Sequence, residues 1–229
     1  MRRFFYDEDL IFDETIRLSA DESYHLATVL RAKPGLKICL INALGQSAVA
    51  ECVDVNRKAA LVKIESVETQ AAVSPAIDLY VAPPKGKLFN QLIKQSVEMG
   101  VRHIIPVICE YSENRSTEIP SQCEQTIIEA AKQSGNCHPP KLLAPQAFSE
   151  AVKSSIAGIY GSVELSDTAT RNTAEEISLW IGPEGGFSED ELSELSTHGI
   201  EGVSFGPWIL RVETAVVAGL GHLRTRLKK

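Results

Sequence analysis

The chain has 229 residues and a formal net charge of −7, with 44% hydrophobic and 23% charged residues. These proportions are typical of a globular protein with one large or two smaller domains, and the absence of any run of about 18 apolar residues predicts no membrane span. The charge is uneven, −10 over residues 113–204 and +4 over residues 205–229, so the negative total does not exclude a nucleic-acid partner.

The first third of the chain predicts a small β domain. Residues 36–67 contain three short strands joined by tight turns, "LKICLINA", "SAVAECVDV" and "AALVKIESV", which indicates an antiparallel barrel or sheet. A helical segment, "DESYHLATVLRA" (21–32), precedes them. The stretch "ETQAAVSPA" (68–76) gives little secondary-structure signal, so we place the boundary there and expect domains at 1–70 and 71–229.

Beyond this boundary, strands alternate with helices. We expect strands at 77–83, 103–108, 140–145, 158–163, 177–181 and 202–206, and helices at 87–100, 121–135, 148–155, 188–199 and 212–229. Such alternation indicates a parallel α/β sheet covered by helices on both faces. Ligands of these sheets bind beyond the carboxyl ends of the strands.

The N-terminus and the cysteines indicate the compartment. The first residues, "MRRFFYDEDLIFDE", lack the apolar segment of a signal peptide, so we expect a cytoplasmic protein. The cysteines are odd in number and lack Cys-x-x-Cys spacing, which favours neither a disulfide framework nor a zinc site. They are Cys39, Cys52, Cys109, Cys123 and Cys137. Cys137 and His138 are neighbours, but two adjacent residues do not complete a tetrahedral site, and we expect no metal.

A glycine-rich turn follows the strand expected at 177–181, in "SLWIGPEGGFSEDE" (178–191). It matches neither a dinucleotide fingerprint nor a P-loop, and Glu184 would place a negative charge beside an anion. Ser188 and Glu191 form a capping box that begins the next helix. That cap needs one glycine at most, so the additional glycines indicate that another group approaches the backbone closely. A neutral or cationic ligand held by backbone groups is compatible with Glu184.

A second turn, in "FGPWILRVETA" (205–215), also lies at the end of a strand and begins a helix. Together the two turns offer backbone hydrogen bonds, an apolar wall for a flat ring, and the charged residues Arg211 and Glu213. Ordinary roles stay open: Ile209 and Leu210 as core residues, and the two charged residues as a surface ion pair.

The two turns, "IGPEGGFS" and "ILRVETA", resemble those of the 16S ribosomal RNA uracil-N3 methyltransferases, a family in the SPOUT superfamily of S-adenosylmethionine enzymes. The resemblance extends over the whole chain through "YHLATVLRAKPG" (24–35), "VEMGVRHIIPV" (97–107) and "EAAKQSG" (129–135).

The resemblance implies an α/β fold with a SPOUT-type parallel sheet and a C-terminal trefoil knot, preceded by a small PUA-like β-barrel domain that binds RNA. It also implies a homodimer and an S-adenosylmethionine cofactor bound in a bent form by the two turns. The cofactor-binding residues would be Ile181, Gly182, Pro183, Glu184, Gly185, Gly186, Phe205, Gly206, Ile209 and Leu210.

The same mapping places Arg211 and Glu213 beside the reacting methyl group as catalytic residues. The nucleophile, N3 of a uracil ring, carries a weakly acidic proton, so it needs deprotonation or stabilisation of the resulting anion. Arg211 is a fixed cation suited to that anion or to a phosphate. Glu213 either orients Arg211 or acts as a base, and we favour orientation because a carboxylate paired with arginine is a weak base.

Basic residues in the first domain and after the first strand of the second are candidates for RNA contacts, and each is equally compatible with a solvated surface charge. They are Arg2, Arg3, His25, Arg31, Lys33, Lys85 and Lys87. Gln95, Asn136 and Trp208 stand where the family usually has basic residues. These three departures bear on RNA affinity and target.

The main hypothesis is an S-adenosylmethionine-dependent methyltransferase acting on N3 of a uridine in 16S (small-subunit) ribosomal RNA. Two alternatives stay open. One is a non-catalytic RNA-binding or ribosome-assembly protein of the same fold, and the other is a SPOUT methyltransferase with another RNA target.

Overall fold

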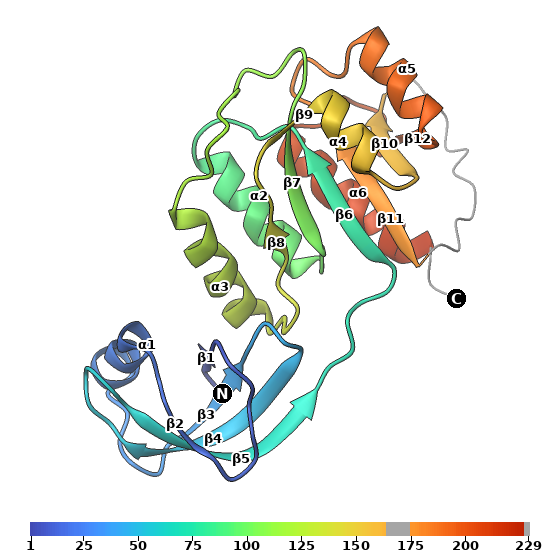
Figure 1. The fold of residues 1–229 in the computed structure, drawn as a ribbon. Coiled ribbons are helices and arrows are strands. Elements are labelled where there is room, and N and C mark those ends of the chain that lie inside the picture. The colour runs from blue at the N-terminus through green and yellow to red at the C-terminus, as the bar shows by residue number, and fades with distance from the viewer. Residues whose placement is uncertain (164–174, 227–229) are drawn as a thin grey trace. The chain divides into compact units, whose positions relative to one another are not determined.

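The computed structural model describes residues 1–163 and 175–226 (Figure 1). The chain divides into two compact units. The first unit consists of Met1–Ala72 together with Ile128–Pro139, and the second begins with Val73–Ile127 and resumes at Pro140. The boundary expected between residues 70 and 71 lies two residues before the end of the first segment, Ala72.

The first unit contains one five-stranded sheet with the order β1-β3-β4-β5-β2. Its strands are β1 (Arg3–Phe5), β2 (Thr15–Arg17), β3 (Lys37–Ile41), β4 (Gln46–Asp54) and β5 (Leu61–Thr69). β1 runs parallel to β3, and the other pairs are antiparallel. The three strands expected between residues 36 and 67 are therefore present as β3, β4 and β5, and they pair in the antiparallel sense that was predicted.

Alternating side chains build the core of this unit. Ile38, Ala50 and Val62 come from three neighbouring strands and are buried, whereas their neighbours along each strand are more exposed. This two-residue period places one face of the sheet against the core. Leu26, from the helical segment before β3, packs into the same cluster.

The helix expected over 21–32 is shorter and changes its geometry. α1 (Ala20–Tyr24) begins at Ser19, whose hydroxyl accepts a hydrogen bond from the Glu22 N–H, and it continues as a π-helical segment η1 (His25–Val29). The segment ends before Arg31, whose φ of 50° is left-handed. A left-handed residue cannot continue a right-handed helix, so the helical pattern stops early.

Residues 128–139 belong to the first unit, although the sequence assigned them to the second domain. The Lys132 ammonium lies 2.6 Å from the Glu22 carboxylate, and the Arg3 guanidinium donates to the Gln133 carbonyl at 2.9 Å. The Gly45 N–H donates to the Cys137 carbonyl. These contacts join residues far apart in sequence, which is why a reading of local pattern missed them.

The second unit is built on a parallel sheet with the order β12-β10-β11-β6-β7-β8, and β9 pairs with β7. Its strands are β6 (Ala76–Val81), β7 (His103–Ile108), β8 (Lys141–Leu142), β9 (Gln146–Ala147), β10 (Gly158–Ser162), β11 (Glu176–Ile181) and β12 (Ile200–Ser204). Its helices are α2 (Lys87–Glu98), α4 (Phe148–Ser154), α5 (Glu189–Thr197) and α6 (Val212–Arg226), and α3 (Gln122–Ser134) begins in this unit and continues into residues of the first. The predicted alternation is confirmed, and residues 227–229 of the expected last helix lie outside the described residues.

Helices cover both faces of this sheet, as its near-continuously apolar strands require. On one face Trp180 of β11 stacks on Tyr80 of β6 with ring centroids 4.3 Å apart, and Phe148 of α4 meets the indole edge-on. Leu195 of α5 packs into the same cluster. On the other face α6 contacts β11 and α2 (Figure 1).

The amino ends of the central strands are joined by an ion-pair network. Arg102, just before β7, donates to both carboxylate oxygens of Asp78 in β6 at 2.8 and 2.7 Å, and it also binds Glu176 in β11. These hydrogen bonds raise the pKa of the Arg102 guanidinium and lower that of Glu176. The network holds three parallel strands in register at the edge opposite their carboxyl ends.

The residues that the structure describes contain neither a membrane-spanning helix nor a cluster of metal ligands. No helix within 1–163 or 175–226 has the length and apolar character to cross a bilayer. The same residues contain no group of three histidine, cysteine, aspartate or glutamate side chains arranged to hold a metal ion.

Candidate functional site

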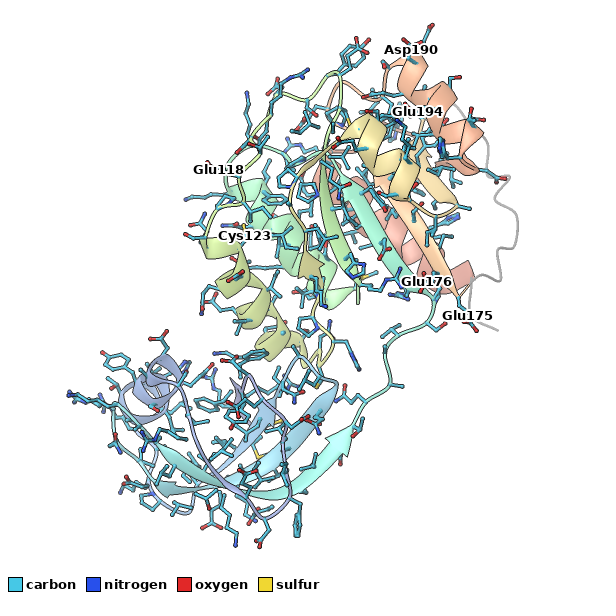
Figure 2. All side chains as sticks on the ribbon, in the orientation of Figure 1. Glu118, Cys123, Glu175, Glu176, Asp190 and Glu194 are labelled. Atoms are coloured by element: carbon cyan, nitrogen blue, oxygen red, sulfur yellow. The ribbon has the colours of Figure 1, made fainter. Side chains whose placement is uncertain are left out.

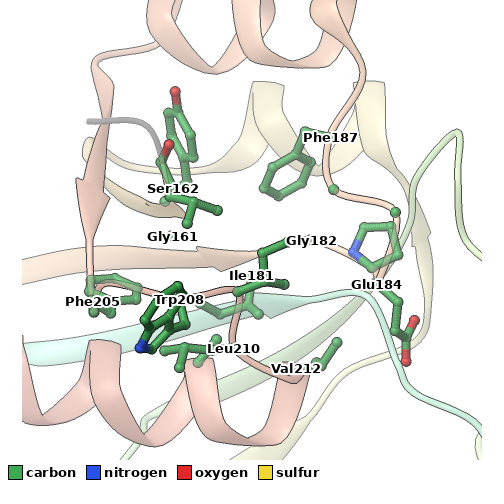
Figure 3. Close-up of a pocket in the computed structure, with 18 of the residues that line it drawn as sticks. Gly161, Ser162, Ile181, Gly182, Glu184, Phe187, Phe205, Trp208, Leu210 and Val212 are labelled. Atoms are coloured by element: carbon green, nitrogen blue, oxygen red, sulfur yellow. The ribbon is translucent and has the colours of Figure 1, made fainter.

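A cavity of about 380 Å³ opens at the carboxyl ends of β10, β11 and β12 (Figure 3). It is lined by residues 160–163, 181–187, 205–206 and 208–210, together with Leu192 of α5 and Val212 and Ala215 of α6. All ten residues that the sequence assigned to cofactor binding are among them. The two glycine-containing turns, which are separate in sequence, therefore form opposite walls of one cavity.

Sheet topology explains why the turns meet. β10, β11 and β12 run parallel, so their carboxyl ends lie at one edge of the sheet. The chain passes from β6 to β7 on one side of β6 and then builds β10, β11 and β12 on the other side. Such a reversal of strand order leaves a crevice at the carboxyl ends, which is the usual ligand position in open α/β sheets.

Packing and backbone conformation within the chain itself require glycine at three positions of the first turn. A Cβ on Gly182 would lie 3.2 Å from the Phe187 ring, and one on Gly185 would lie 3.0 Å from Cβ of Tyr111. Gly186 has a φ of 77°, which L side chains rarely adopt. The sequence predicted that another group approaches this backbone closely. At Gly182 and Gly185 that group is an aromatic residue of the chain itself, Phe187 and Tyr111 respectively.

The second turn uses small residues in the same way. The Phe205 ring lies against Gly161 of β10 and Gly219 of α6, where an added Cβ would be about 3.0 Å from the ring in each case. Any side chain larger than glycine at these two positions would displace the ring. Phe205 thus forms a fixed apolar wall of the cavity, close to Ile181 and Leu210 (Figure 3).

A capping box fixes the helix that follows the first turn, as predicted. The Ser188 hydroxyl accepts from the Glu191 N–H, and the Glu191 carboxylate accepts from the Ser188 N–H at 2.9 Å. The other carboxylate oxygen of Glu191 accepts from the Glu110 N–H at 2.8 Å. Glu191 therefore also connects α5 to the segment after β7, which the sequence pattern did not reveal.

Charge inside the cavity is sparse. Within residues 1–163 and 175–226, Glu184 is the one charged residue that lines it, and no basic side chain of these residues does so. Other acidic residues project elsewhere: Asp190 and Glu194 from α5, and Glu176 at the amino end of β11 (Figure 2). An apolar cavity with exposed glycine backbone and a single carboxylate fits a neutral or cationic ligand with a flat ring, and it does not fit a phosphate group.

Arg211 and Glu213 adjoin the cavity without lining it. Arg211 is exposed and lies between Leu210 and Val212, which both line it, whereas Glu213 is 8% exposed in the first turn of α6. Within residues 1–163 and 175–226 no ion pair joins them. Residues two apart at a helix start point in different directions, so the expected orienting pair is not formed here.

Comparison with known proteins agrees with this geometry. A family model described as an RNA methyltransferase domain matches residues 72–224, and one described as an RNA methyltransferase PUA domain matches residues 18–65. The chain belongs to the RNA methyltransferase family. The resemblance noted in the two turns is thereby confirmed, and the first unit is the PUA-like domain that it implied.

Relatives of this family cover nearly the whole chain. A ribosomal RNA small subunit methyltransferase E from Rickettsia conorii is 27% identical over 97% of this chain and 94% of its own length. One from Neisseria gonorrhoeae, solved bound to S-adenosylmethionine, has a TM-score of 0.90 at 28% identity and covers 98% of this chain and 97% of its own. A Legionella pneumophila protein solved with the same cofactor has a TM-score of 0.87 at 28% identity, covering 97% and 96%.

The structure places the RNA-contact candidates of the first unit in different roles. Arg2, Arg31 and Lys33 are exposed. Arg3 instead donates to the carbonyls at the end of α3, and the half-buried His25 ring meets Phe4 edge-on at 5.7 Å. Arg3 and His25 therefore have structural partners, which the sequence reading left open.

The candidates of the second unit lie near a second cavity. Lys87 is exposed and lines a cavity of about 430 Å³ beside the carboxyl ends of β6 and β7, together with Asn90 and Asn114. Lys85 is exposed and lies 2.8 Å from Glu113, whose hydrogen bond raises the pKa of the lysine. Both lysines stay accessible to a polyanion.

The three departures from the family pattern have distinct settings. Gln95 is half-buried in α2, and Asn136 accepts a hydrogen bond from the His138 N–H at 2.7 Å. Cys137 is buried and the His138 ring bonds the Gln70 carbonyl, so neither supplies a free cation beside Asn136. Trp208 lines the first cavity.

Sequence reasoning missed the wall that β10 contributes. Residues 160–163 line the cavity, with Tyr160 and Phe187 meeting edge-on at 6.0 Å. The signal available for it was Gly161 in "GIYGSV", a glycine near the end of a strand, and a single glycine is weak evidence for a site.

Proposed function

We propose that this protein is an S-adenosylmethionine-dependent methyltransferase that modifies N3 of a uridine in small-subunit ribosomal RNA. The observation that carries the proposal is the cavity formed by the two turns, whose lining, as far as the structure describes the chain, contains the carboxylate of Glu184 and no cation. The named relatives act on small-subunit ribosomal RNA, and their similarity over nearly the whole chain supports the same substrate.

The residues present fit this cofactor. The cavity volume of about 380 Å³ lies in the range of small-molecule sites. Backbone groups of residues 182–186 and 205–206 would bind polar atoms of the cofactor, and Ile181, Phe205 and Leu210 would contact its flat ring. Glu184 places a negative charge where a cationic ligand is favoured. When bound, S-adenosylmethionine supplies a methyl group on a positively charged sulfur.

Arg211 and Glu213 would act on the RNA side of the reaction. Arg211 is exposed beside the cavity, so its guanidinium is free to bind the uracil oxygens and stabilise negative charge that follows loss of the N3 proton. Glu213, buried at the start of α6, stays a candidate for positioning or for accepting that proton. Holding the uracil N3 near the methyl group would supply much of the acceleration.

Further parts of the proposal follow the same resemblance. Arg2, Arg31, Lys33, Lys85 and Lys87 are accessible for phosphate contacts. We also propose a homodimer, a trefoil knot formed by the segments around the cavity, and action on ribosomal RNA in the cytoplasm.

Nucleoside analysis tests the proposal directly. The protein is incubated with small-subunit ribosomal RNA and S-adenosylmethionine, and the digested RNA is examined by mass spectrometry. We expect 3-methyluridine. Reverse transcriptase should stop at one site on the RNA, because N3-methylation blocks the base-pairing edge of the uracil. A different methylated nucleoside would indicate another RNA target. Absence of both methylation and cofactor binding would indicate a non-catalytic RNA-binding or assembly protein.

Replacing Arg211 separates binding from chemistry. We expect Arg211→Ala to fold and to bind S-adenosylmethionine within about twofold of the unchanged protein, but to lose roughly 100-fold or more in methylation rate. Lys153→Ala, an exposed cation on α4, is the matched control and should stay fully active. Normal turnover by Arg211→Ala would remove this residue from the mechanism.

A further inference from the structure

The second turn exposes a large aromatic side chain at the cavity. Trp208 is 79% exposed and its neighbour Ile209 is 81% exposed, whereas the chain's other tryptophan, Trp180, is 1% exposed within the core. Exposed tryptophan is uncommon because its ring carries a large apolar area. A solvated indole at a ligand cavity indicates that a binding partner covers it.

Trp208 is part of the cavity lining but not of its packed wall. The neighbouring ring, Phe205, is held by Gly161 and Gly219 and packs near His222. Among the described residues, Trp208 makes no ring contact and its indole N–H has no hydrogen-bond partner. In Figure 3 its ring lies beside Phe205 and Leu210. The indole is therefore a free flat surface where the cavity meets solvent.

The charge around this surface determines what it can bind. Among the described residues, Glu184 is the only charged residue in the lining, so this part of the cavity offers no cation to hold an RNA phosphate. A nucleobase can instead be held by stacking, which needs a flat ring and no charge. A base presented to the cavity must also leave its own stack, and an exposed indole replaces the stacking that it loses.

We propose that Trp208 stacks on an RNA base presented to the cavity and positions that base for methylation. The inference rests on the proposed function, and it assigns the ring to the RNA rather than to the cofactor or to a second copy of the chain. Stacking contributes binding that does not depend on salt. Trp208 should therefore act mainly on the KM for RNA, and the salt dependence of RNA binding should be unchanged.

The test uses Trp208→Ala, Trp208→Phe and the control Val73→Ala in the full-length protein, with a small-subunit ribosomal RNA transcript as the probe. We expect Trp208→Ala to raise the KM for RNA roughly 5- to 150-fold, to leave S-adenosylmethionine affinity within about twofold, and to leave the salt slope unchanged. Trp208→Phe should restore most of the loss because phenylalanine also stacks. Val73→Ala, at an apolar side chain that is 54% exposed, lacks a ring and lies outside the cavity lining, should stay within about twofold.

Intrinsic fluorescence gives a direct signal, because Trp180 is buried and only Trp208 is accessible to RNA. RNA should quench the emission of the unchanged protein and not that of Trp208→Phe. If Trp208→Ala has an unchanged KM for RNA, the inference about Trp208 is overturned. The proposed function still stands in that case, provided that the parent protein methylates the RNA. Weakened cofactor binding would assign the ring to the cofactor, and dissociation of a dimer in sedimentation would assign it to a partner copy; either result overturns the inference. A parent protein that neither binds nor methylates the RNA overturns both proposals.

Discussion

Glu191 makes the sharpest stability prediction, because one buried carboxylate holds two segments. Its oxygens accept from the N–H groups of Ser188 at 2.9 Å and Glu110 at 2.8 Å. Hydrogen bonds to a charged group contribute about 1.5–3 kcal/mol each. Glu191→Ala removes both, so we expect a loss of about 3–6 kcal/mol in the free energy of unfolding. Glu191→Gln keeps one acceptor oxygen but turns its amide N–H₂ toward a backbone N–H. We therefore expect the free energy of unfolding to fall by about 1.5–3 kcal/mol.

Two further variants calibrate this series. Ser188→Ala removes only the side-chain cap and should cost about 1 kcal/mol. Glu189→Ala removes an exposed acid of the same first helical turn and should cost roughly 0.3–1 kcal/mol. Urea unfolding followed by tryptophan fluorescence measures the second unit, which contains both Trp180 and Trp208. If Glu191→Ala were no more destabilising than Ser188→Ala, the link between α5 and the segment after β7 would contribute nothing, and the reasoning would be refuted.

Two other predictions concern the cavity wall and the thiols. Gly219→Ala places a Cβ about 2.9 Å from Leu179 and 3.0 Å from the Phe205 ring, so the ring must move. We expect this variant to bind S-adenosylmethionine about tenfold more weakly in calorimetry. Gly221→Ala is the control and should leave the affinity unchanged, because nothing lies within 4 Å of its added Cβ. Burial raises the pKa of Cys109 to about 12, so the thiolate is scarce at neutral pH. This thiol should therefore react with a disulfide reagent only after the protein unfolds. Rapid modification of Cys109 in the native protein would contradict the burial.

The regular elements could be predicted because their signals are local. Apolar runs bounded by turn residues predicted strand 103–108, which is β7, and a 3.6-residue period ending at a glycine predicted α2. The π-helical segment His25–Val29 and the transfer of residues 128–139 to the first unit were not predicted. The assignment of residues 128–139 depends on contacts between residues that are distant in sequence, such as the Lys132–Glu22 pair.

The candidate site could be predicted in part for the same reason. Two turns carry local signals, surplus glycines in one and a charged helix start in the other, and both line the cavity. The wall from β10 and the support of Gly185 by Tyr111 carry almost no local signal. Arg211 and Glu213 form no ion pair among the described residues, because residues two apart at a helix start point in different directions, and their roles stay a prediction.

The glycines of residues 182–186 show what such a turn does and does not indicate. Surplus glycine was interpreted as room for a ligand, yet Gly182 and Gly185 are crowded by Phe187 and Tyr111. The interpretation still led to the cavity, because Gly182, Gly185 and Gly186 all line it. A preorganised backbone binds a ligand without a further ordering cost. We therefore expect glycines that leave space for aromatic rings of the same chain to support ligand binding, as glycines that contact the ligand do. The charge of the turn, here that of Glu184, should then favour a neutral or cationic ligand.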